Sequence, residues 1–312
     1  MDKPWVWKVT MVTIVLMGTG VGIGLQALRQ QSSSPSPPLS AQSPRPLLPP
    51  AEMRYRVDRL SNSTVHVLTI PKAYWQTQAV VPAVAASVTS LDQFAQQRGA
   101  IAVINGGFFD PETGKTASYV TINGLLVADP RQNDRLMHNP DVVPYQAKIL
   151  NRSELRRYRC GSQIRYAIAR HQDAIPATCQ LQDALGAGPR LLPAIAAEAE
   201  GFWATVQGEV VRDPLGMNRR NARTAIGLTP DESMLWVMVA QLPSQPDNSG
   251  MTLPELAQYL RSLGAVEALN LDGGSSSSLY YQGNTIYGRV DETGQPTGRW
   301  VQSVLLIKPN PY

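Results

Sequence analysis

The sequence predicts an α+β fold, in which a mixed β-sheet core carries few helices and two helix–strand units converge on one site. Short apolar runs typical of strands recur along most of the chain beyond residue 53. Only two segments, residues 91–98 and 253–263, combine the apolar spacing and the capping signals of helices. Each is followed by an apolar strand that ends in a polar residue and two glycines.

The first element is an apolar N-terminal segment. Residues 9–28 contain no charged side chain, which is about the length that one helix needs to cross a bilayer. Lys3 and Lys8 precede this run, and Arg29 follows it. We therefore predict that residues 1–29 form a membrane anchor and that the rest of the chain is extracytoplasmic. A cleaved signal peptide, giving a secreted protein, is the alternative.

A linker and one large domain follow. Residues 30–52 are rich in Ser and Pro and cannot bury a core, so we expect a semi-rigid, extended linker. Residues 53–312 then form the globular domain. Its expected strands include an Asn-Gly hairpin and a second hairpin around residues 230–231. The expected strand segments are 65–70, 100–104, 121–126, 225–228, 234–240, 265–271, 278–281 and 301–307.

The two helices begin with the same signal. Ser90 stands three residues before Gln93, and Thr252 three residues before Glu255, which is the spacing of a capping box. Both helices then run into a Gly-Ala pair and an apolar strand. The sequence thus contains a possible internal repeat of a helix and a strand.

The ends of these two strands are expected to lie together. The first ends in Asn105-Gly106-Gly107 and the second in Asp272-Gly273-Gly274. The polar residue stands five positions past the alanine in the first unit and seven in the second. A difference of two is one strand period, so Asn105 and Asp272 should face the same way. Chance resemblance of two short segments is the alternative.

The composition limits the partners of the chain. Apolar residues make up 43% of the sequence and charged residues 17%, as in a globular domain. A net charge of +4 suits an anionic ligand. Seven basic residues gather within residues 148–170, but export makes nucleic acid an unsuitable partner, and a solvated face or contact with an anionic polymer is expected instead.

The Asp272-Gly273-Gly274 loop is the strongest candidate for a site. Glycines allow a ligand to approach the backbone closely. The hydroxyls of Ser275 and Ser276 that follow can donate to sugar or phosphate oxygens. A tight turn without any ligand is the alternative.

The Asn105 loop is the expected partner. Asn105, Gly106 and Gly107 can offer side-chain and backbone donors to an anion, and Phe108 can form a platform for the face of a sugar. Asp110 is either a second carboxylate of the site or only the start of a turn.

Two arginines stand next to sequence features that would point their side chains into the domain. Arg223 stands just before a buried strand, and Arg190 follows a Gly-Pro turn. A guanidinium binds phosphate bidentately and stays charged, so both are expected to bind phosphate. Surface salt bridges are the alternative.

The chain has two cysteines, Cys160 and Cys179. In an oxidising compartment an isolated pair is expected to form a disulfide that closes a loop. Two free buried thiols are the alternative.

Several familiar catalytic motifs are missing. Gly107 lies too far upstream of Gly114-Lys115-Thr116 for a phosphate-binding loop, and no Gly-x-Ser-x-Gly is present. None of the three histidines has metal-ligand spacing with another. We therefore expect no cofactor and no metal, and chemistry based on carboxylates and arginines.

Four stretches of the sequence resemble the phosphodiester glycosidase family. They are Val-Ile-Asn-Gly-Gly-Phe-Phe (103–109), Gly-Pro-Arg-Leu (188–191), Ala-Arg-Thr-Ala-Ile-Gly (222–227), and the segment from Gly-Met-Thr-Leu to Asp-Gly-Gly (250–274). The resemblance spans roughly residues 100–307. Ser275 is a departure, since the family often has a third glycine there, and residues 151–182 have no matching segment.

The resemblance implies hydrolysis of the bond between the anomeric carbon of a sugar and a phosphodiester, with a sugar-phosphate or phosphoglycan as substrate. Asp272 would act as base or nucleophile at the anomeric carbon. Arg223 and Arg190 would hold the phosphate, with Asn105 as a further donor. The amides of Gly106 and Gly107 would be further donors to the phosphate, and Ser275 and Ser276 would orient sugar hydroxyls.

Two rival functions use the same residues. One is a non-catalytic, membrane-tethered protein that binds anionic envelope glycans. The other is a serine hydrolase built on residues 275–278. Release of free sugar separates the enzyme from the binding protein, and an irreversible serine reagent identifies the serine hydrolase. Protein partners and oligomeric state are not indicated by the sequence.

Overall fold

The computed structural model describes residues 52–76 and 78–309 of the chain. The predicted N-terminal segment, residues 1–29, and the linker up to residue 51 lie outside these ranges. Among the helices that are described, none is both long enough and apolar enough to cross a membrane.

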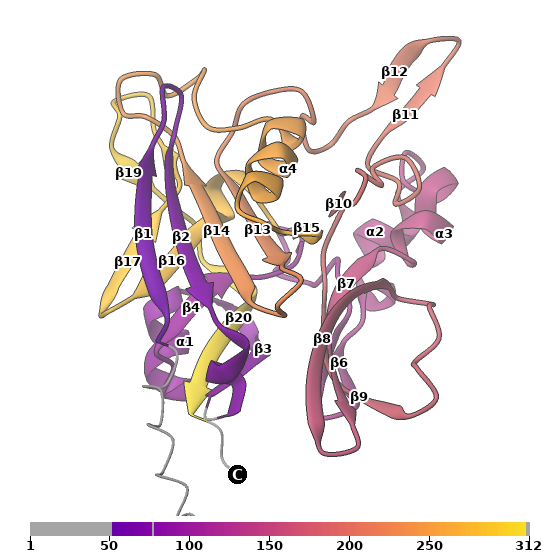
Figure 1. Cartoon of the computed structure of the whole chain (residues 1–312). Helices are drawn as coiled ribbons and strands as arrows, with labels where there is room; N and C mark the ends of the chain where they lie inside the picture. The colour runs from indigo at the N-terminus through magenta and orange to yellow at the C-terminus, as the bar shows by residue number, and fades with distance from the viewer. Residues whose placement is uncertain (1–51, 77, 310–312) are drawn as a thin grey trace, which may run out of the picture. The chain divides into compact units, whose positions relative to one another are not determined.

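The α+β class with few helices is confirmed (Figure 1). Three antiparallel sheets, named here the first, second and third sheet, account for most of the strands. In spatial order the first sheet contains β1 (Arg54–Arg59), β2 (Thr64–Ile70), β14 (Met234–Ala240), β13 (Arg223–Leu228), β15 (Glu267–Asn270) and β10 (Arg190–Leu192).

The other two sheets have five strands each. The second sheet contains β17 (Asn284–Tyr287), β16 (Ser278–Tyr281), β4 (Ala102–Asn105), β20 (Val301–Pro309) and β3 (Gln78–Thr89). The third sheet contains β6 (Leu125–Ala128), β5 (Val120–Ile122), β9 (Cys179–Gly186), β7 (Ser153–Cys160) and β8 (Gln163–Arg170). Two small hairpins complete the strands: β11 (Ala204–Val206) with β12 (Glu209–Arg212), and β18 (Arg289–Val290) with β19 (Pro296–Thr297).

The helices are short. The α-helices are α1 (Leu91–Arg98), α2 (Asp134–His138), α3 (Gln146–Ile149) and α4 (Leu253–Ser262). Single turns of 3₁₀-helix are η1 (Lys72–Gln76), η2 (Pro130–Gln132), η3 (Val143–Tyr145) and η4 (Gly274–Ser276). The predicted helices 91–98 and 253–263 correspond to α1 and α4, and both begin with the expected capping box.

The largest apolar cluster lies where the three sheets meet. It contains Trp236 of the first sheet, Ile104 of the second and Leu185 of the third, all 0% exposed. The outer face of the first sheet is covered by α4, and the outer face of the second by α1. Because β14 is buried on both faces, its seven residues are apolar without interruption, whereas a strand with one wet face would alternate.

Both predicted hairpins are present. In the first, β5 and β6 are joined by Asn123 and Gly124, whose φ angles of 51° and 77° match a turn that needs two positive φ values. In the second, β13 and β14 pair along their full length.

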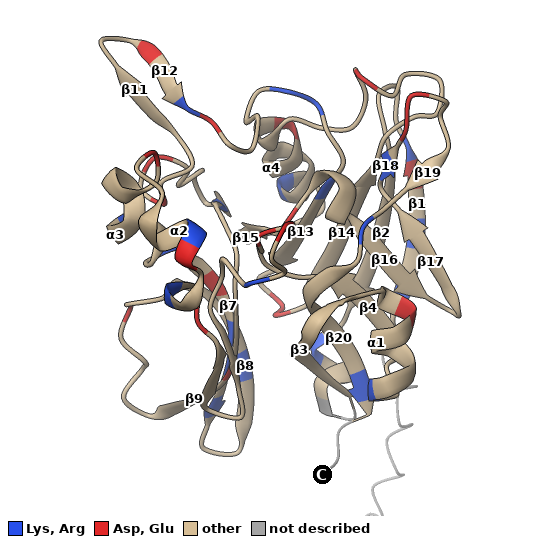
Figure 2. Ribbon diagram, turned by 180° about the vertical axis from the view of Figure 1, so that it is seen from behind, with Lys and Arg blue, Asp and Glu red and all other residues tan. Residues whose placement is uncertain are grey.

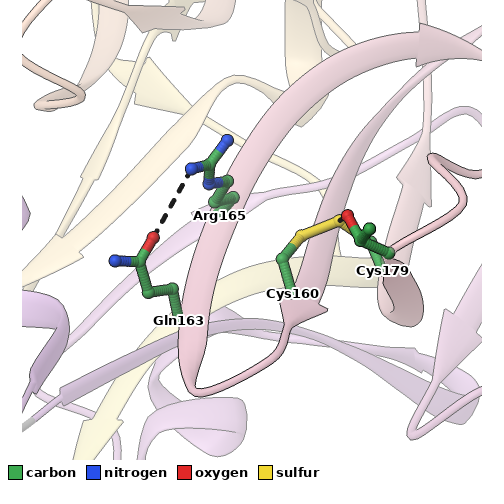
Figure 3. The surroundings of a disulfide bond; sticks show 5 residues. Cys160, Gln163, Arg165 and Cys179 are labelled. Atoms are coloured by element: carbon green, nitrogen blue, oxygen red, sulfur yellow. Dashed lines mark hydrogen bonds between the residues drawn. A yellow bond between two sulfur atoms is a disulfide. The ribbon is translucent and has the colours of Figure 1, made fainter. Parts of the chain in front are cut away.

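The predicted disulfide between Cys160 and Cys179 is present (Figure 3). Cys160 ends β7 and Cys179 begins β9, and the two residues are direct partners in the ladder. The bond therefore joins two inner strands of the third sheet at the end of their ladder, and the loop that it closes contains β8.

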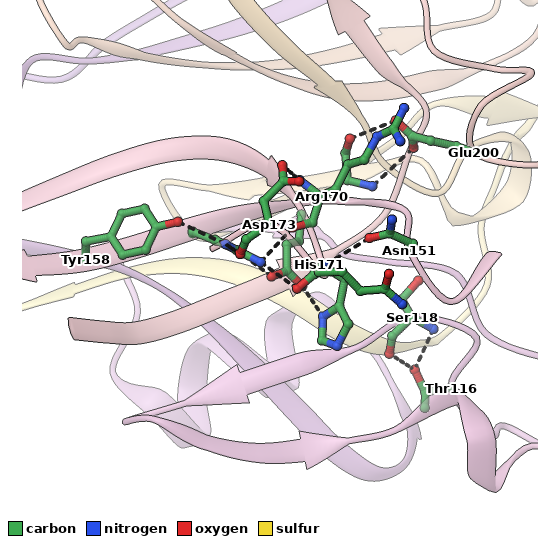
Figure 4. Close-up of polar contacts among 12 residues, drawn as sticks. Thr116, Ser118, Asn151, Tyr158, Arg170, His171, Asp173 and Glu200 are labelled. Atoms are coloured by element: carbon green, nitrogen blue, oxygen red, sulfur yellow. Dashed lines mark hydrogen bonds and ion pairs between the residues drawn. The ribbon is translucent and has the colours of Figure 1, made fainter. Parts of the chain in front are cut away.

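Part of the basic stretch 148–170 is buried, contrary to the expectation of a solvated face. Arg156 is 2% exposed and pairs with Glu154 at 2.6 Å between Nε and Oε1. It also donates to the Tyr158 hydroxyl and to the carbonyls of Arg170 and His171 (Figure 4). The third sheet thus uses one of these arginines as a buried cross-link between its strands and the following loop.

Candidate active site

The two glycine loops meet, as the internal repeat predicts. The Asn105 side chain donates from Nδ2 to the carbonyl of Asp272 at 2.7 Å. The Asp272 amide donates back to the carbonyl of Gly106 at 3.1 Å. The end of β4 and the end of β15 are therefore tied to each other by reciprocal hydrogen bonds, although they belong to different sheets.

Asn105 connects these loops and does not face a ligand. Its Oδ1 accepts from the Thr224 hydroxyl at 2.8 Å and from the Ser278 amide at 3.1 Å. The residue is 0% exposed. Because both ends of the side-chain amide are occupied and buried, the expected contact between Asn105 and substrate has no support in this geometry.

The glycines after Asn105 are required by close packing. The amides of Gly106 and Gly107 donate to the carbonyl and the hydroxyl of Ser303, at 2.8 and 3.1 Å. A Cβ at Gly107 would lie 2.2 Å from the carbonyl oxygen of Gly186. These two amides are therefore not free to bind an anion, and the glycines allow β4, β20 and the end of β9 to approach one another.

Asp272 is the carboxylate at the meeting point. The residue is partly accessible, and Gly273 donates its amide to Oδ1 at 3.0 Å. Burial raises the pKa of Asp272 to about 6, against the smaller opposing influences of the Ser276 hydroxyl, the Arg299 guanidinium and the Gly273 amide. A carboxyl group with such a pKa, in reach of solvent, can act as a base or nucleophile near neutral pH.

The serines after the glycines differ in access. Gly274 has a φ of 60° and donates its amide to Ala222 at 2.8 Å, which starts the turn η4. Ser276 is fully buried, whereas Ser275 is partly accessible. Of these two serines, only Ser275 is within reach of solvent.

Arg223 orders the backbone of segment 215–219 and of Met251. Its guanidinium donates to four backbone carbonyls, those of Met251, Leu215, Gly216 and Arg219. It is 3% exposed, and burial lowers its pKa to about 10. The expected phosphate contact of Arg223 has no support here, because the guanidinium already donates to these carbonyls. The Cδ of Arg223 lies 3.8 Å from an ideal Cβ on Gly273.

Arg190 is held beside β15 by its turn. The Asn270 side chain donates to the Gly188 carbonyl at 2.7 Å, and the Gly188 amide donates to the Asn270 carbonyl at 2.9 Å. Gly188 has a φ of 122°, and a Cβ there would lie 2.5 Å from Glu200 Oε2. The Nε of Arg190 has no acceptor among the described residues. Arg190 is thus brought to the strand that delivers Asp272.

Phe108 lies in a cluster of two aromatic rings and an arginine. Its ring centroid is 5.4 Å from that of Phe202, and the Arg152 guanidinium carbon is 3.6 Å from the centre of the Phe202 ring. Arg152 donates from Nε to the Glu200 carbonyl at 3.0 Å, and burial lowers its pKa to about 9. The ring of Phe108 is therefore partly covered by protein groups.

Glu200 anchors this cluster and was missed by the sequence analysis. The residue is 0% exposed, and Figure 4 shows its polar contacts. Its carboxylate accepts from the amide and hydroxyl of Ser153, at 3.2 and 2.7 Å, and from the amide of Arg190 at 3.1 Å. Nothing in the local sequence separates Glu200 from the neighbouring surface glutamate.

Asp110 begins a turn, which was the alternative considered for it. Its Oδ1 accepts from the amide of Glu112 at 2.9 Å and pairs with Arg135 at 3.3 Å. Burial raises the pKa of Asp110, but the hydrogen bonds of the turn and Arg135 outweigh it, so that the net shift is downward. Within residues 52–76 and 78–309, no hydrogen bond or ion pair joins Asp110 to the Asp272 loop.

Arg299 is the second residue that the sequence analysis missed. Its amide donates to the carbonyl of Ser275 at 2.9 Å, and its guanidinium favours the ionised form of Asp272. The side chain is exposed and forms no ion pair with a described residue. Trp300, the next residue, is 60% exposed. Since Arg299 is 27 positions from Asp272, no local sequence pattern indicates that its guanidinium acts on the Asp272 carboxyl.

Metal-ligating side chains are not grouped in the described ranges, where no set of three or more His, Cys, Asp or Glu residues is placed to hold an ion.

Comparisons with known proteins agree with the resemblance seen in the sequence. The family model for phosphodiester glycosidase matches residues 98–308. No curated protein matches the chain significantly.

Three solved structures share the fold. The catalytic domain of zebrafish N-acetylglucosamine-1-phosphodiester alpha-N-acetylglucosaminidase, auto-inhibited by its pro-peptide, has a TM-score of 0.60 and 17% identity, over 84% of this chain and 85% of that one. A putative exported protein from Burkholderia pseudomallei gives 0.58 and 17%, over 79% and 74%. A hypothetical protein from Synechocystis gives 0.52 and 19%, over 82% of this chain but only 61% of that one.

Proposed function

The chain belongs to the phosphodiester glycosidase family, and from this premise we propose that it is an exported hydrolase that cleaves a sugar-1-phosphodiester at the anomeric bond. The observation that carries the proposal is Asp272, a partly accessible carboxylate with a pKa near 6 where the two glycine loops meet. Water adds to the anomeric carbon, and the bond from this carbon to the phosphate oxygen breaks. The products are a free sugar and a phosphomonoester.

The chemistry matches the groups present. The phosphomonoester that departs is a weakly basic leaving group, so protonation by a general acid matters less than in ordinary glycoside hydrolysis. Above pH 6 an ionised Asp272 can attack the anomeric carbon or take the proton of the attacking water. The departing electron pair goes to the phosphate, where a cationic group stabilises it.

Arg299 is the proposed contact for the phosphate. It is exposed, it lacks an acidic partner among the described residues, and it acts electrostatically on Asp272. Arg190 and Ser275 are proposed as further donors to the substrate. Asn105 and Arg223 take positioning roles, because Asn105 joins the two glycine loops and the guanidinium of Arg223 is committed to the carbonyls of segment 215–219 and of Met251.

Export is part of the proposal. The apolar residues 9–28 and the disulfide of Cys160 with Cys179 suit an extracytoplasmic protein, since such bonds persist in oxidising compartments. Retention as a membrane anchor and cleavage as a signal peptide predict different products: only a retained anchor keeps the purified protein in the membrane fraction.

The decisive test is sugar release by the full-length protein from N-acetylglucosamine-1-phosphodiester and related diesters. Wild type should release sugar, and Asp272→Asn should lose a hundredfold or more of the rate, roughly the share that one acid–base group supplies. Asp231→Asn is a matched control, because its carboxylate serves only the turn between β13 and β14.

Two results would decide against the proposal. Turnover retained in a folded Asp272→Asn protein would remove Asp272 from the chemistry. Glycan binding without sugar release by wild type, over a broad panel, would instead favour the non-catalytic glycan-binding protein.

A further inference from the structure

A polar cavity of about 610 Å³ adjoins the Asp272 loop. Its lining includes Arg219, Arg220 and Arg289, together with Asn221, Asn248 and Asp247. Figure 2 shows basic residues on the loop beside α4, the same region from which Arg219 and Arg220 line the cavity. None of these residues belongs to the site described above.

The cavity carries uncompensated positive charge. Arg220 pairs with Glu255 at 2.6 Å, but the side chains of Arg219 and Arg289 are exposed and have no acceptor among the described residues. Asp247 also lines the cavity and forms no ion pair within residues 52–76 and 78–309. The two unpaired guanidinium groups, of Arg219 and Arg289, outnumber this carboxylate and favour an anionic occupant, which arginine binds with charge-assisted hydrogen bonds.

The wall of the cavity touches the loop of the proposed active site. An ideal Cβ placed on Gly274 would lie 3.6 Å from Asn221 Nδ2 and 4.0 Å from Arg289 Nη1. Because Gly274 carries no side chain, nothing projects from it between Asp272, two residues earlier, and the arginines. A ligand whose anomeric carbon lies at Asp272 can extend through its phosphodiester past Gly274 into the cavity.

We propose that this cavity binds a second anionic group, carried on the alcohol side of the phosphodiester that is cleaved. The inference rests on the proposed function. It assigns the substrate class as sugar-1-phosphodiesters whose alcohol part bears a further phosphate, as in one unit of a glycosyl-phosphate chain. Arg219 and Arg289 are the residues that recognise this group.

The first test compares two diesters of the same sugar, one with a methyl group and one with a 3-phosphopropyl group on the alcohol side. Wild type should prefer the phosphate-bearing diester in kcat/KM. The double variant Arg219→Gln/Arg289→Gln should lose about tenfold or more of kcat/KM on that substrate, mainly through KM, because charge-assisted hydrogen bonds are lost. Its activity on the methyl diester should not change.

Arg98→Gln is the matched control, since Arg98 is an exposed arginine at the end of α1. It should leave both substrates unaffected. No preference of wild type for the phosphate-bearing diester, or equal loss on both substrates in the double variant, would overturn the inference.

A second measurement separates this inference from the proposed function. Binding of pyrophosphate, followed by calorimetry, should be tenfold or more weaker in the double variant and unchanged in Asp272→Asn. If wild type cleaves neither diester, the proposed function fails while this binding result still tests the cavity. Pyrophosphate affinity that is equal in wild type and the double variant would show that the cavity is not an anion site.

Discussion

At the scale of single residues, the sequence predicted which side chains carry suitable functional groups better than it predicted where those side chains lie in the fold. Asp272 was identified from the Gly-Gly that follows it, and the structure brings it to the meeting of two loops. Asn105 and Arg223 carry the right groups for phosphate, but those groups bind backbone instead. Arg299 was missed because its closeness to Asp272 arises from tertiary folding and leaves no local signal.

The pKa of Asp272 predicts a pH dependence. Activity should fall as the pH drops below about 6, because the protonated carboxyl is neither a base nor a nucleophile. The folded pKa lies above the ordinary value, so the stability contributed by Asp272 is fully present below that ordinary value and is lost as pH rises through about 6. A pH–rate profile and thermal melts across this range measure both effects.

The Asp272→Asn variant serves as the reference for these melts. Its melting temperature should exceed that of wild type at pH 8, and the difference should vanish toward pH 4. A kcat/KM that stays constant from pH 5 to pH 8 would contradict a raised pKa at the catalytic carboxylate.

At the scale of elements, periodic and capped segments could be predicted, and strongly charged strands could not. The helices α1 and α4 and both turn-defined hairpins follow from caps, spacing and Asn-Gly. The strands β7 and β8 were missed, because Arg156 and its neighbours make the sequence read as a solvated surface. Buried ion pairing lets a charged residue occupy a strand, as Arg156 does in β7 with Glu154, one strand period away.

The variant Gly107→Ala tests the close contact between the end of β4 and the end of β9. Gly107→Ala should lower the free energy of unfolding by about 3 kcal/mol, since a Cβ 2.2 Å from the Gly186 carbonyl forces two backbones apart. Denaturant titration measures the change. Gly161→Ala is the control: with nothing within 4 Å and a φ of 61°, it should cost about 1 kcal/mol for the left-handed backbone alone. Equal losses in both variants would show that the junction tolerates a side chain.

At the scale of the whole described domain, the α+β fold class could be predicted from the sequence, but the pairing of the strands into three sheets could not. Apolar runs show that many strands exist, but they do not tell which strands pair, so one mixed core was expected where three sheets share an apolar cluster. The pairing depends on contacts between distant segments, such as β4 with β20.

The variant Trp236→Ala tests whether the three sheets unfold together. Trp236 is 0% exposed within the shared cluster, so Trp236→Ala should lower the free energy of unfolding by about 3–5 kcal/mol. Near-UV and far-UV circular dichroism should still report one transition, at lower denaturant. Trp300→Ala, at a 60% exposed position, should change stability by no more than about 0.5 kcal/mol. Two separated transitions would mean that the third sheet is an independent unit.

The buried amide of Asn105 has a consequence for how this protein can diversify. One side chain bonds to the Asp272 loop, to β13 through Thr224 and to the start of β16 through Ser278. A mutation of Asn105 breaks several of these hydrogen bonds at once and is selected against. Among the described residues, the segment with Arg299 and Trp300 has one backbone hydrogen bond to Ser275 and is open to solvent. Descendants of this chain can therefore explore new ligands by substitution at Trp300, while Arg299 and the hydrogen bonds of Asn105 keep the proposed site.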